Sequence, residues 1–256
     1  MKTTMATRSA QGTVEIAATP ERIWKALTDA TDLVRWFPLE AAVEPGEGGS
    51  IYMSWKNEYA ETSKILAWDP PRRLAIVWGW GESKDQHPQM TEYRLEARGK
   101  TTVLRVVTSG FPADPAWDEY VEGTNRGWVF ELQSLKQYLE HHDGENRRVV
   151  YLRRRVPTTA AAGWERLFTP SGLGERPFDA GVFDRKPPHQ YAAIVSELGG
   201  GLFRASCDPC MTATDHRDVT LWLQAWGDQR DALDQYAEAW PRLLTRLFPE
   251  GVPPEV

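Results

Sequence analysis

The most reactive side chains in the sequence are its two cysteines, which form one Cys-x-x-Cys motif, Cys207-Asp208-Pro209-Cys210. A structural zinc site needs about four ligands, but the sequence has no second cysteine pair, and Asp215 and His216 could only assist. A redox pair requires its first thiol at a helix N-terminus, whereas this motif follows a predicted strand and precedes no helical pattern. The motif is therefore predicted to be an ordinary turn.

Motifs for other catalytic chemistries are also missing from the sequence. It has no Ser-His-Asp order, nucleotide-binding loop or HExxH pattern. His141 and His142 end a predicted helix, where a cationic side chain suits the helix dipole, and His87 and His189 fall in proline-containing loops. We therefore expect no metal and no cofactor.

Acid–base catalysis would require a polar side chain inside an otherwise apolar cavity. The residues that could serve are Tyr52, Tyr59, Glu92, Tyr93 and Arg94. Because side chains alternate between the two faces of a strand, Glu92 and Arg94 are expected on the face opposite Tyr93. Catalysis is therefore kept as an alternative interpretation.

Composition excludes some function classes. The 256 residues carry a net charge of −6, whereas general nucleic-acid binders usually have a basic surplus. The basic cluster from 147 to 155 is broken by apolar residues, which is typical of a strand with a solvated face. The sequence also lacks the run of about 18 apolar residues that crosses a bilayer and the apolar core of a secretory signal. We expect a cytoplasmic protein that neither binds nucleic acid nor inserts into membranes.

The chain contains 12 tryptophans, which is high for its length. The large indole ring carries an N–H that needs a partner, so tryptophans gather where apolar surface meets a cavity or a binding partner. Several are expected to line a pocket, although filling of a large core is the alternative.

The order of elements in the first half is that of an α+β fold. A strand at 13–17 is followed by a helix that Thr19-Pro20-Glu21 opens and by a second short helix ending at Phe37-Pro38. Alternating strands with short turns then indicate an antiparallel meander, at 39–43, 50–57, 61–68, 72–80, 90–97 and 101–109. A long helix is predicted from 115 to 141, with Trp128, Leu132, Leu135 and Leu139 on one stripe.

The second half repeats the first in outline. Trp24, Leu27 and Leu33 are matched by Trp164, Leu167 and Leu173 at one offset (164 − 24 = 140, 167 − 27 = 140, 173 − 33 = 140). Tryptophan-containing matches at fixed spacing indicate an internal repeat. Strands are predicted at 149–156, 190–198, 201–207 and 218–226, and the segment 171–189 gives little strand signal. The second unit is therefore expected to keep the frame of the first with part of its sheet missing.

Motifs across the first half resemble one known family. They are Ala18-Thr19-Pro20-Glu21-Arg22-Ile23-Trp24-Lys25-Ala26-Leu27-Thr28, Leu33-Val34-Arg35-Trp36-Phe37, Glu47-Gly48-Gly49-Ser50-Ile51, Asp69-Pro70-Pro71-Arg72-Arg73-Leu74 with Trp78, and Gly127-Trp128 with Leu132 and Leu135. Together they resemble the AHSA1-like group (activator of Hsp90 ATPase homologue) of the START-like, or SRPBCC, superfamily, and the second half resembles that superfamily faintly.

The resemblance implies a helix-grip fold, in which an antiparallel sheet wraps around a long C-terminal helix, here in tandem. We predict one domain at 12–144 and a shortened second domain at 148–249, joined by a linker at 145–148. The family's cavity lies between sheet and helix and commonly accepts lipids, polyketides or other hydrophobic molecules. The segments with which eukaryotic co-chaperones contact Hsp90 have no counterpart in this sequence, so an Hsp90-type chaperone is not expected as a partner.

Strand alternation predicts which side chains would line such a cavity. The candidate ligand-binding residues are Trp36 and Phe37 near its mouth, with Ile51, Met53, Trp55, Ile76, Trp78, Trp80, Tyr93, Trp128 and Leu132 around it. The main hypothesis is that the first domain binds or sequesters a small hydrophobic molecule, while the second packs against it or provides a homodimer surface. The alternatives are a cyclase, dehydratase or hydrolase acting on aromatic or polyketide-like substrates, and a co-chaperone-like interaction module.

Overall fold

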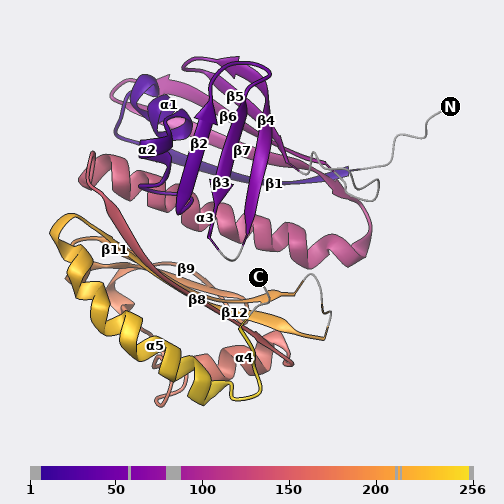
Figure 1. Ribbon diagram of the computed structural model, residues 1–256, viewed down its shortest axis with the longest axis vertical. Coiled ribbons are helices and arrows are strands. Elements are labelled where there is room, and N and C mark those ends of the chain that lie inside the picture. The colour runs from indigo at the N-terminus through magenta and orange to yellow at the C-terminus, as the bar shows by residue number, and fades with distance from the viewer. Residues whose placement is uncertain (1–6, 57–58, 79–87, 211–212, 214, 254–256) are drawn as a thin grey trace. The chain divides into compact units, whose positions relative to one another are not determined.

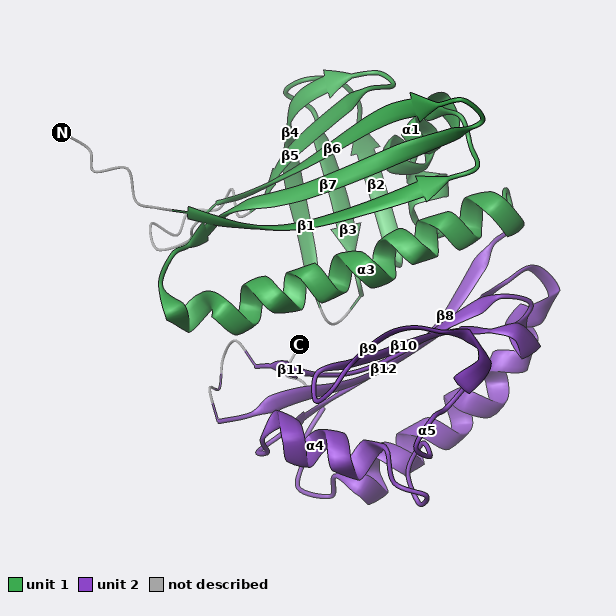
Figure 2. Cartoon of the chain, turned by 180° about the vertical axis from the view of Figure 1, so that it is seen from behind, with its two compact units in different colours: residues 1–144 green, residues 145–256 purple. Residues whose placement is uncertain are grey.

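The computed structural model describes residues 7–56, 59–78, 88–210, 213 and 215–253. The chain divides into two compact units, residues 1–144 and 145–256, which Figure 2 distinguishes by colour. Each unit combines one antiparallel sheet with helices, so the predicted α+β class with antiparallel sheets is confirmed. Among the described helices, none is both long enough and apolar enough to span a bilayer.

The first unit contains seven strands and three α-helices within the described residues (Figure 1). In chain order these are β1 (Thr7–Ile16), α1 (Pro20–Thr28), α2 (Ala30–Leu33), β2 (Glu40–Glu44), β3 (Ser50–Ser54), β4 (Ala60–Asp69), β5 (Arg73–Trp78), β6 (Gln89–Arg98), β7 (Thr101–Pro112), the 3-10 helix η1 (Pro115–Trp117) and α3 (Asp118–His141). The predicted helix from 115 thus begins as a 3-10 turn, which the Asp114 side chain caps by accepting from the amide of Ala116.

The seven strands form one sheet in the order β1-β7-β6-β5-β4-β3-β2, with every pair antiparallel. Consecutive strands from β2 to β7 are neighbours in the sheet, as in a meander. At the tight turn between β6 and β7, Gly99 has φ +63°, a left-handed conformation that glycine adopts without strain. The sequence-predicted meander is therefore confirmed, although several strands are longer or shorter at their ends.

Helix α3 lies along one face of this sheet, and its closest approach to the sheet is along β1 (Figures 1 and 2). Gly12 of β1 permits that approach, since a Cβ there would stand 2.6 Å from Leu132 Cδ1 and 3.0 Å from Trp128 Cβ. Three bonds reinforce the contact: Asn125 accepts from the Gln11 amide, Lys136 donates to the Glu15 carbonyl, and Glu140 accepts from the Ala17 amide.

The second unit has a five-stranded sheet in the order β8-β12-β11-β10-β9. Its elements are β8 (Arg147–Val156), α4 (Ala160–Leu167), η2 (Asp179–Gly181), β9 (Val182–Lys186), β10 (Gln190–Val195), η3 (Ser196–Leu198), β11 (Gly201–Pro209), β12 (Arg217–Trp226), η4 (Gly227–Leu233) and α5 (Asp234–Leu247). One continuous apolar core joins the sheet to side chains of α4 and α5.

Two expectations for the second half need correction. The segment 171–189 contains strand β9, which pairs with β10, although its glycines and prolines hide the alternation. The charged segment 145–148 is not a linker throughout, because β8 begins at Arg147 and pairs there with Trp226.

Candidate functional site

The side of the first sheet that faces α3 is called here the inner face. It is lined by alternate residues of each strand, and Ile51, Met53, Ile76 and Tyr93 are buried on it, between 1% and 3% exposed. From the helix, Trp128 and Leu132 are 5% and 3% exposed. Trp55 and Trp78 are half-buried, and Trp80 lies outside the described residues. The structure thus brings most of the sequence-predicted lining residues together, and their role in binding stays a prediction.

Five aromatic rings from four parts of the first unit lie close together and are called the aromatic cluster. Phe37 is at its centre: its ring stacks on Trp36 at 5.1 Å, meets Trp55 edge-on at 5.2 Å and lies 5.9 Å from Trp128. Trp128 in turn meets the Tyr93 ring edge-on at 5.9 Å. Offset and edge-on contacts of this kind are the favoured geometries between aromatic rings. Trp36 is fully buried, so it lies deeper than the position near the mouth that the sequence predicted.

Two hydrogen bonds fix Trp36 in the fold. Its indole N–H donates to the Ala26 carbonyl at 2.9 Å, and its own carbonyl accepts from the Ser134 hydroxyl at 2.7 Å. These bonds tie the end of the short helix α2 to α1 on one side and to α3 on the other. The aromatic cluster is therefore held in place by polar contacts that lie behind it.

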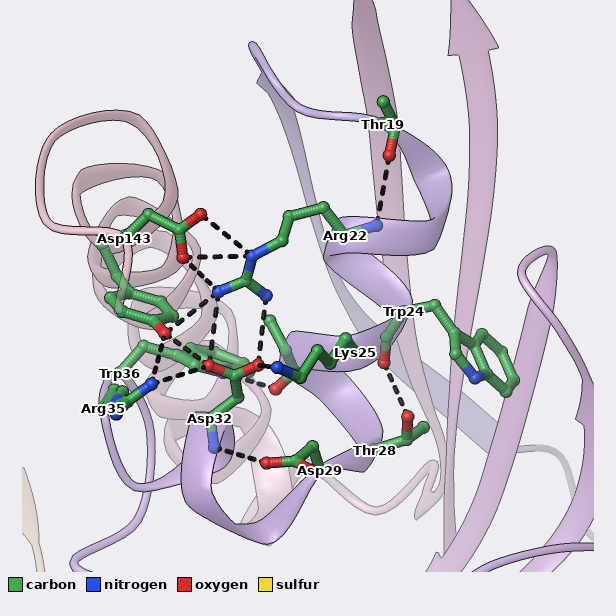
Figure 3. Close-up of polar contacts among 12 residues, drawn as sticks. Thr19, Arg22, Trp24, Lys25, Thr28, Asp29, Asp32, Arg35, Trp36 and Asp143 are labelled. Carbon is green, nitrogen blue, oxygen red and sulfur yellow. Dashed lines mark hydrogen bonds and ion pairs between the residues drawn. The ribbon is translucent and has the colours of Figure 1, made fainter. Parts of the chain in front are cut away.

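A buried ion network holds α1, α2 and α3 together at this end of the unit (Figure 3). At its centre Asp32 is 1% exposed and accepts from Arg22 at 3.2 and 3.3 Å, from Arg35 at 3.3 Å and from the Tyr138 hydroxyl. Arg22 also bridges to Asp143, just beyond α3, and its hydrogen bond holds the pKa of Asp143 below the ordinary value. Because Asp32 is buried, loss of its partners would leave a charge without compensation, which is the costly change at a buried ion pair.

Local sequence places Asp32 in that network. Thr19 caps α1 by accepting a hydrogen bond from the Arg22 amide at 3.2 Å. This cap fixes where α1 begins and therefore the side of the helix on which Arg22 lies. Asp29 ends α1 and caps α2 by accepting from the Asp32 amide at 3.0 Å. Such caps satisfy amides that the first helical turn leaves without a partner. The start of α1 at Thr19 was predicted from the sequence, whereas the burial of Asp32 was not.

Two tyrosines of the first unit, Tyr93 of β6 and Tyr120 of α3, each lie near a carboxylate. Burial, followed by the nearby negative charge of Glu131, raises the pKa of Tyr93. Burial and then the charge of Glu61 raise the pKa of Tyr120, whose side chain also forms a hydrogen bond with Gln89. Tyr93 was predicted to be a polar residue of the cavity, whereas the carboxylates of Glu61 and Glu131 were not. Alternation along β4 and helical spacing along α3 were the signals that could have identified them.

Several polar groups of the first unit are paired. Trp128 donates its indole N–H to the Thr108 hydroxyl at 3.0 Å, and that hydroxyl lies 3.0 Å from the hydroxyl of Thr91. On the opposite face of the sheet, Glu92 accepts from both Arg73 and Arg94 at 2.6 Å. The predicted placement of Glu92 and Arg94 away from Tyr93 is therefore confirmed.

Both cysteines of the Cys-x-x-Cys motif are free and buried. Burial, with a smaller contribution from the charge of Asp208, raises the pKa of Cys207 to about 12, which keeps that thiol protonated and unreactive at neutral pH. Among the described residues, no group of three or more His, Cys, Asp or Glu side chains is arranged to hold a metal ion.

Residues 17–140, which include α1, the aromatic cluster and most of α3, match the family model described as activator of Hsp90 ATPase homolog 1-like protein. This part of the chain belongs to that AHSA1-like family. The matched residues all lie in the first unit, and the family's helix-grip arrangement of antiparallel sheet and long C-terminal helix is the one observed there. None of the curated proteins compared with the sequence matches it.

Similar folds occur among solved structures. Protein MLL2253 from Mesorhizobium loti is 24% identical, with a TM-score of 0.47, over 53% of this chain and 99% of its own. The Aha1 dimer from Colwellia psychrerythraea is 21% identical, with a TM-score of 0.48, over 54% and 99%. DynU16, a protein from the dynemicin biosynthetic locus, is 17% identical, with a TM-score of 0.46, over 93% of this chain and 96% of its own. The family assignment rests on the matched family model and not on these similarities.

Proposed function

We propose that the first unit of this AHSA1-like protein binds a small, largely apolar molecule between the inner face of its sheet and α3. The observation that carries the proposal is the open side of Gly127, in the middle of that helix. Gly127 is half-buried, and a Cβ added to it would meet no atom within 4 Å beyond the backbone of its own helix, whereas a Cβ in a close-packed core has neighbours on every side.

The surroundings of Gly127 indicate that this space faces the aromatic cluster. Residues three, four and seven apart share one side of a helix, so Gly127 lies on the stripe of Tyr120, Glu131 and Ser134. Tyr120 forms a hydrogen bond with Gln89 of β6, and the charge of Glu131 raises the pKa of Tyr93. Ser134 donates a hydrogen bond to the Trp36 carbonyl. A molecule beside Gly127 would therefore contact aromatic rings with a small number of polar groups around them, which is the usual make-up of a small-molecule site.

Native mass spectrometry of the gently purified protein is the first test. We expect a discrete apolar compound in stoichiometric amount, released on denaturation. If the protein carries nothing, it is titrated with N-phenyl-1-naphthylamine, an uncharged probe whose fluorescence rises in an apolar site. Saturable binding of one probe per chain supports the proposal, and absence of both a retained compound and saturable probe binding overturns it.

A larger side chain inside the proposed site should weaken binding of the probe. Met53→Trp enlarges a side chain on the inner face of β3, and we expect it to weaken probe binding about 10-fold, equivalent to about 1.4 kcal/mol. Tyr52→Trp enlarges the neighbouring side chain on the other face of the same strand and serves as the matched control. Gly127→Leu fills the site from the helix. Equal effects of Met53→Trp and Tyr52→Trp, or unfolding in both Met53→Trp and Gly127→Leu, would show that the inner face is packed core.

One observation favours acid–base chemistry on the bound molecule as a second candidate function. The buried phenol of Tyr93 keeps its proton because burial and the charge of Glu131 raise its pKa, so it is suited to donate a hydrogen bond to negative charge that develops on a bound molecule. Dehydratase or hydrolase activity predicts a difference in mass between a compound supplied to the protein and the compound recovered from it, and cyclase activity predicts a difference in chromatographic retention. Either difference should disappear in Tyr93→Phe, while binding of N-phenyl-1-naphthylamine should remain.

A further inference from the structure

The inner face carries a polar row across three strands. Ile51 of β3 pairs with Ser63 of β4, and Trp78 of β5 pairs with Gln89 of β6. The β4–β5 register pairs Lys64 with Val77, and one further antiparallel step places Ser63 opposite Trp78. Ser63, Trp78 and Gln89 therefore stand side by side across the sheet, at the level where Tyr120 of α3 bonds Gln89.

Two polar atoms of this row have no hydrogen-bond partner among the described residues. They are the Ser63 hydroxyl oxygen and the Trp78 indole nitrogen, and both atoms are inaccessible to solvent. The whole Ser63 residue is 0% exposed. A buried polar group without a partner is costly, and native proteins rarely keep one unless something else satisfies it. Gln89 and the paired hydroxyls of Thr91 and Thr108 show that neighbouring polar groups on the same face are satisfied.

The chemistry of the two atoms defines what would satisfy both. An indole N–H only donates, and a serine hydroxyl can donate as well as accept. One oxygen that accepts from both is therefore the complementary group. The nearby negative charge of Glu61, which contributes to the raised pKa of Tyr120, disfavours an anionic oxygen such as a carboxylate. A neutral oxygen on an apolar framework fits the row.

We infer that Ser63 and Trp78 select ligands carrying a neutral hydrogen-bond-accepting oxygen, a phenolic hydroxyl or a carbonyl group, on an otherwise apolar skeleton. This inference rests on the proposed binding function and goes beyond it, because it names the group that the site recognises and the two side chains that recognise it. The apolar part of the ligand lies against the aromatic cluster, and its oxygen is directed to the polar row.

The test compares two probes of nearly equal shape, 1-naphthol and 1-methylnaphthalene, by calorimetric titration. We expect the wild-type protein to bind 1-naphthol more tightly than 1-methylnaphthalene. In Ser63→Ala the dissociation constant of 1-naphthol should rise about 5-fold, while that of 1-methylnaphthalene should stay unchanged. Trp78→Phe removes the indole N–H and should shift the ratio of the two dissociation constants in the same direction. Thr62→Ala, the next residue on the exposed face of β4, is the matched control and should leave the ratio unchanged.

Thermal unfolding without probe separates recognition from structural support. Because Ser63→Ala removes a buried hydroxyl that has no partner in the described structure, the melting temperature should stay the same or rise. If both probes bind but neither Ser63→Ala nor Trp78→Phe changes the ratio, this inference is overturned and the proposed binding function stands. If neither probe nor N-phenyl-1-naphthylamine binds the wild-type protein, the binding function itself fails.

Discussion

The two units enclose their interiors in different ways. In the second unit the rings of Phe178, Tyr191 and Trp240 all lie within 6.2 Å of Phe203, and the Tyr191 hydroxyl donates to the Pro177 carbonyl at 2.8 Å. In the first unit α3 approaches the sheet most closely along β1, and the middle of the helix keeps open space at Gly127. The interior of the second unit is filled by its own rings, whereas the interior of the first unit is proposed to leave room for a ligand.

The difference begins in elements that the two halves share. Thr19 and Thr159 stand 140 residues apart and cap α1 and α4 in the same way, each accepting from the amide three residues later. The residues behind the first cap are not repeated: at the same offset Ala162 replaces Arg22 and Gly172 replaces Asp32. The second half therefore keeps the signal that starts the helix but lacks the charges that anchor the aromatic cluster.

The largest expected difference between the two units is the loss of stability when one aromatic ring is removed. Phe203→Ala leaves a cavity among packed rings and is expected to destabilise the second unit by about 3–5 kcal/mol. Trp78→Ala removes a larger but half-buried side chain beside the proposed binding site, so we expect a loss in the first unit of less than about 2 kcal/mol. Hydrogen exchange measured by mass spectrometry reports each unit's peptides separately. Equal costs would show that the first interior is as full as the second.

Removal of the charge at the centre of the ion network should have the next largest effect. Asp32→Ala leaves Arg22 and Arg35 without their shared buried partner, and we expect a loss of about 3 kcal/mol, at the low end of the range for broken buried pairs because Arg22 keeps Asp143. Asp29→Ala removes only the cap of α2 and should cost about 1 kcal/mol. Urea unfolding of both variants measures the difference. A loss in Asp32→Ala no greater than in Asp29→Ala would show that the network does not anchor this end of the unit.

Much of the fold could be predicted from local pattern. Alternation along β3, β5 and β6 placed Met53, Ile76 and Tyr93 on one face because apolar side chains mark the buried side with period two. The same rule gave no warning of Ser63, since a polar residue on the inner face looks like a surface residue in the sequence. Strand β9 was missed because its glycine- and proline-rich surroundings show no alternation of apolar and polar residues. Its extended conformation comes instead from pairing with β10.

The anchoring of the candidate site was less predictable than its lining. Arg22 and Asp143 are 121 residues apart, and Tyr138 reaches Asp32 across 106 residues. Charged residues on a short helix are usually solvated, so the sequence offers no reason to expect Asp32 to be buried. Contacts of this kind follow only from the way α3 returns to the start of the unit, which is a property of the whole fold.

A pH dependence distinguishes the buried tyrosines of the two units and has the smallest expected effect. Burial raises the pKa of both Tyr93 and Tyr191, with Glu131 the neighbouring charge in the first unit and Asp179 in the second. A raised folded-state pKa gives stability that is fully present below the ordinary tyrosine value of 10.0 and is lost as the pH rises towards the folded-state pKa. Stability should therefore fall between about pH 10 and 11, by at most about 1.4 kcal/mol per pH unit for one tyrosine.

Tyr93→Phe removes one such group, so its urea-unfolding free energy should decline less steeply over that interval than the wild-type value. Glu131→Gln should have the same sign and a smaller size, because it removes only the charge and leaves the burial that is the larger cause of the raised pKa. Tyr191→Phe provides the comparison in the second unit, and Glu131→Gln leaves the charge beside that tyrosine in place. If Tyr93→Phe changes the slope and Glu131→Gln does not, burial alone raises the pKa of Tyr93. Glu131 would then have no part in the acid–base chemistry proposed for that tyrosine.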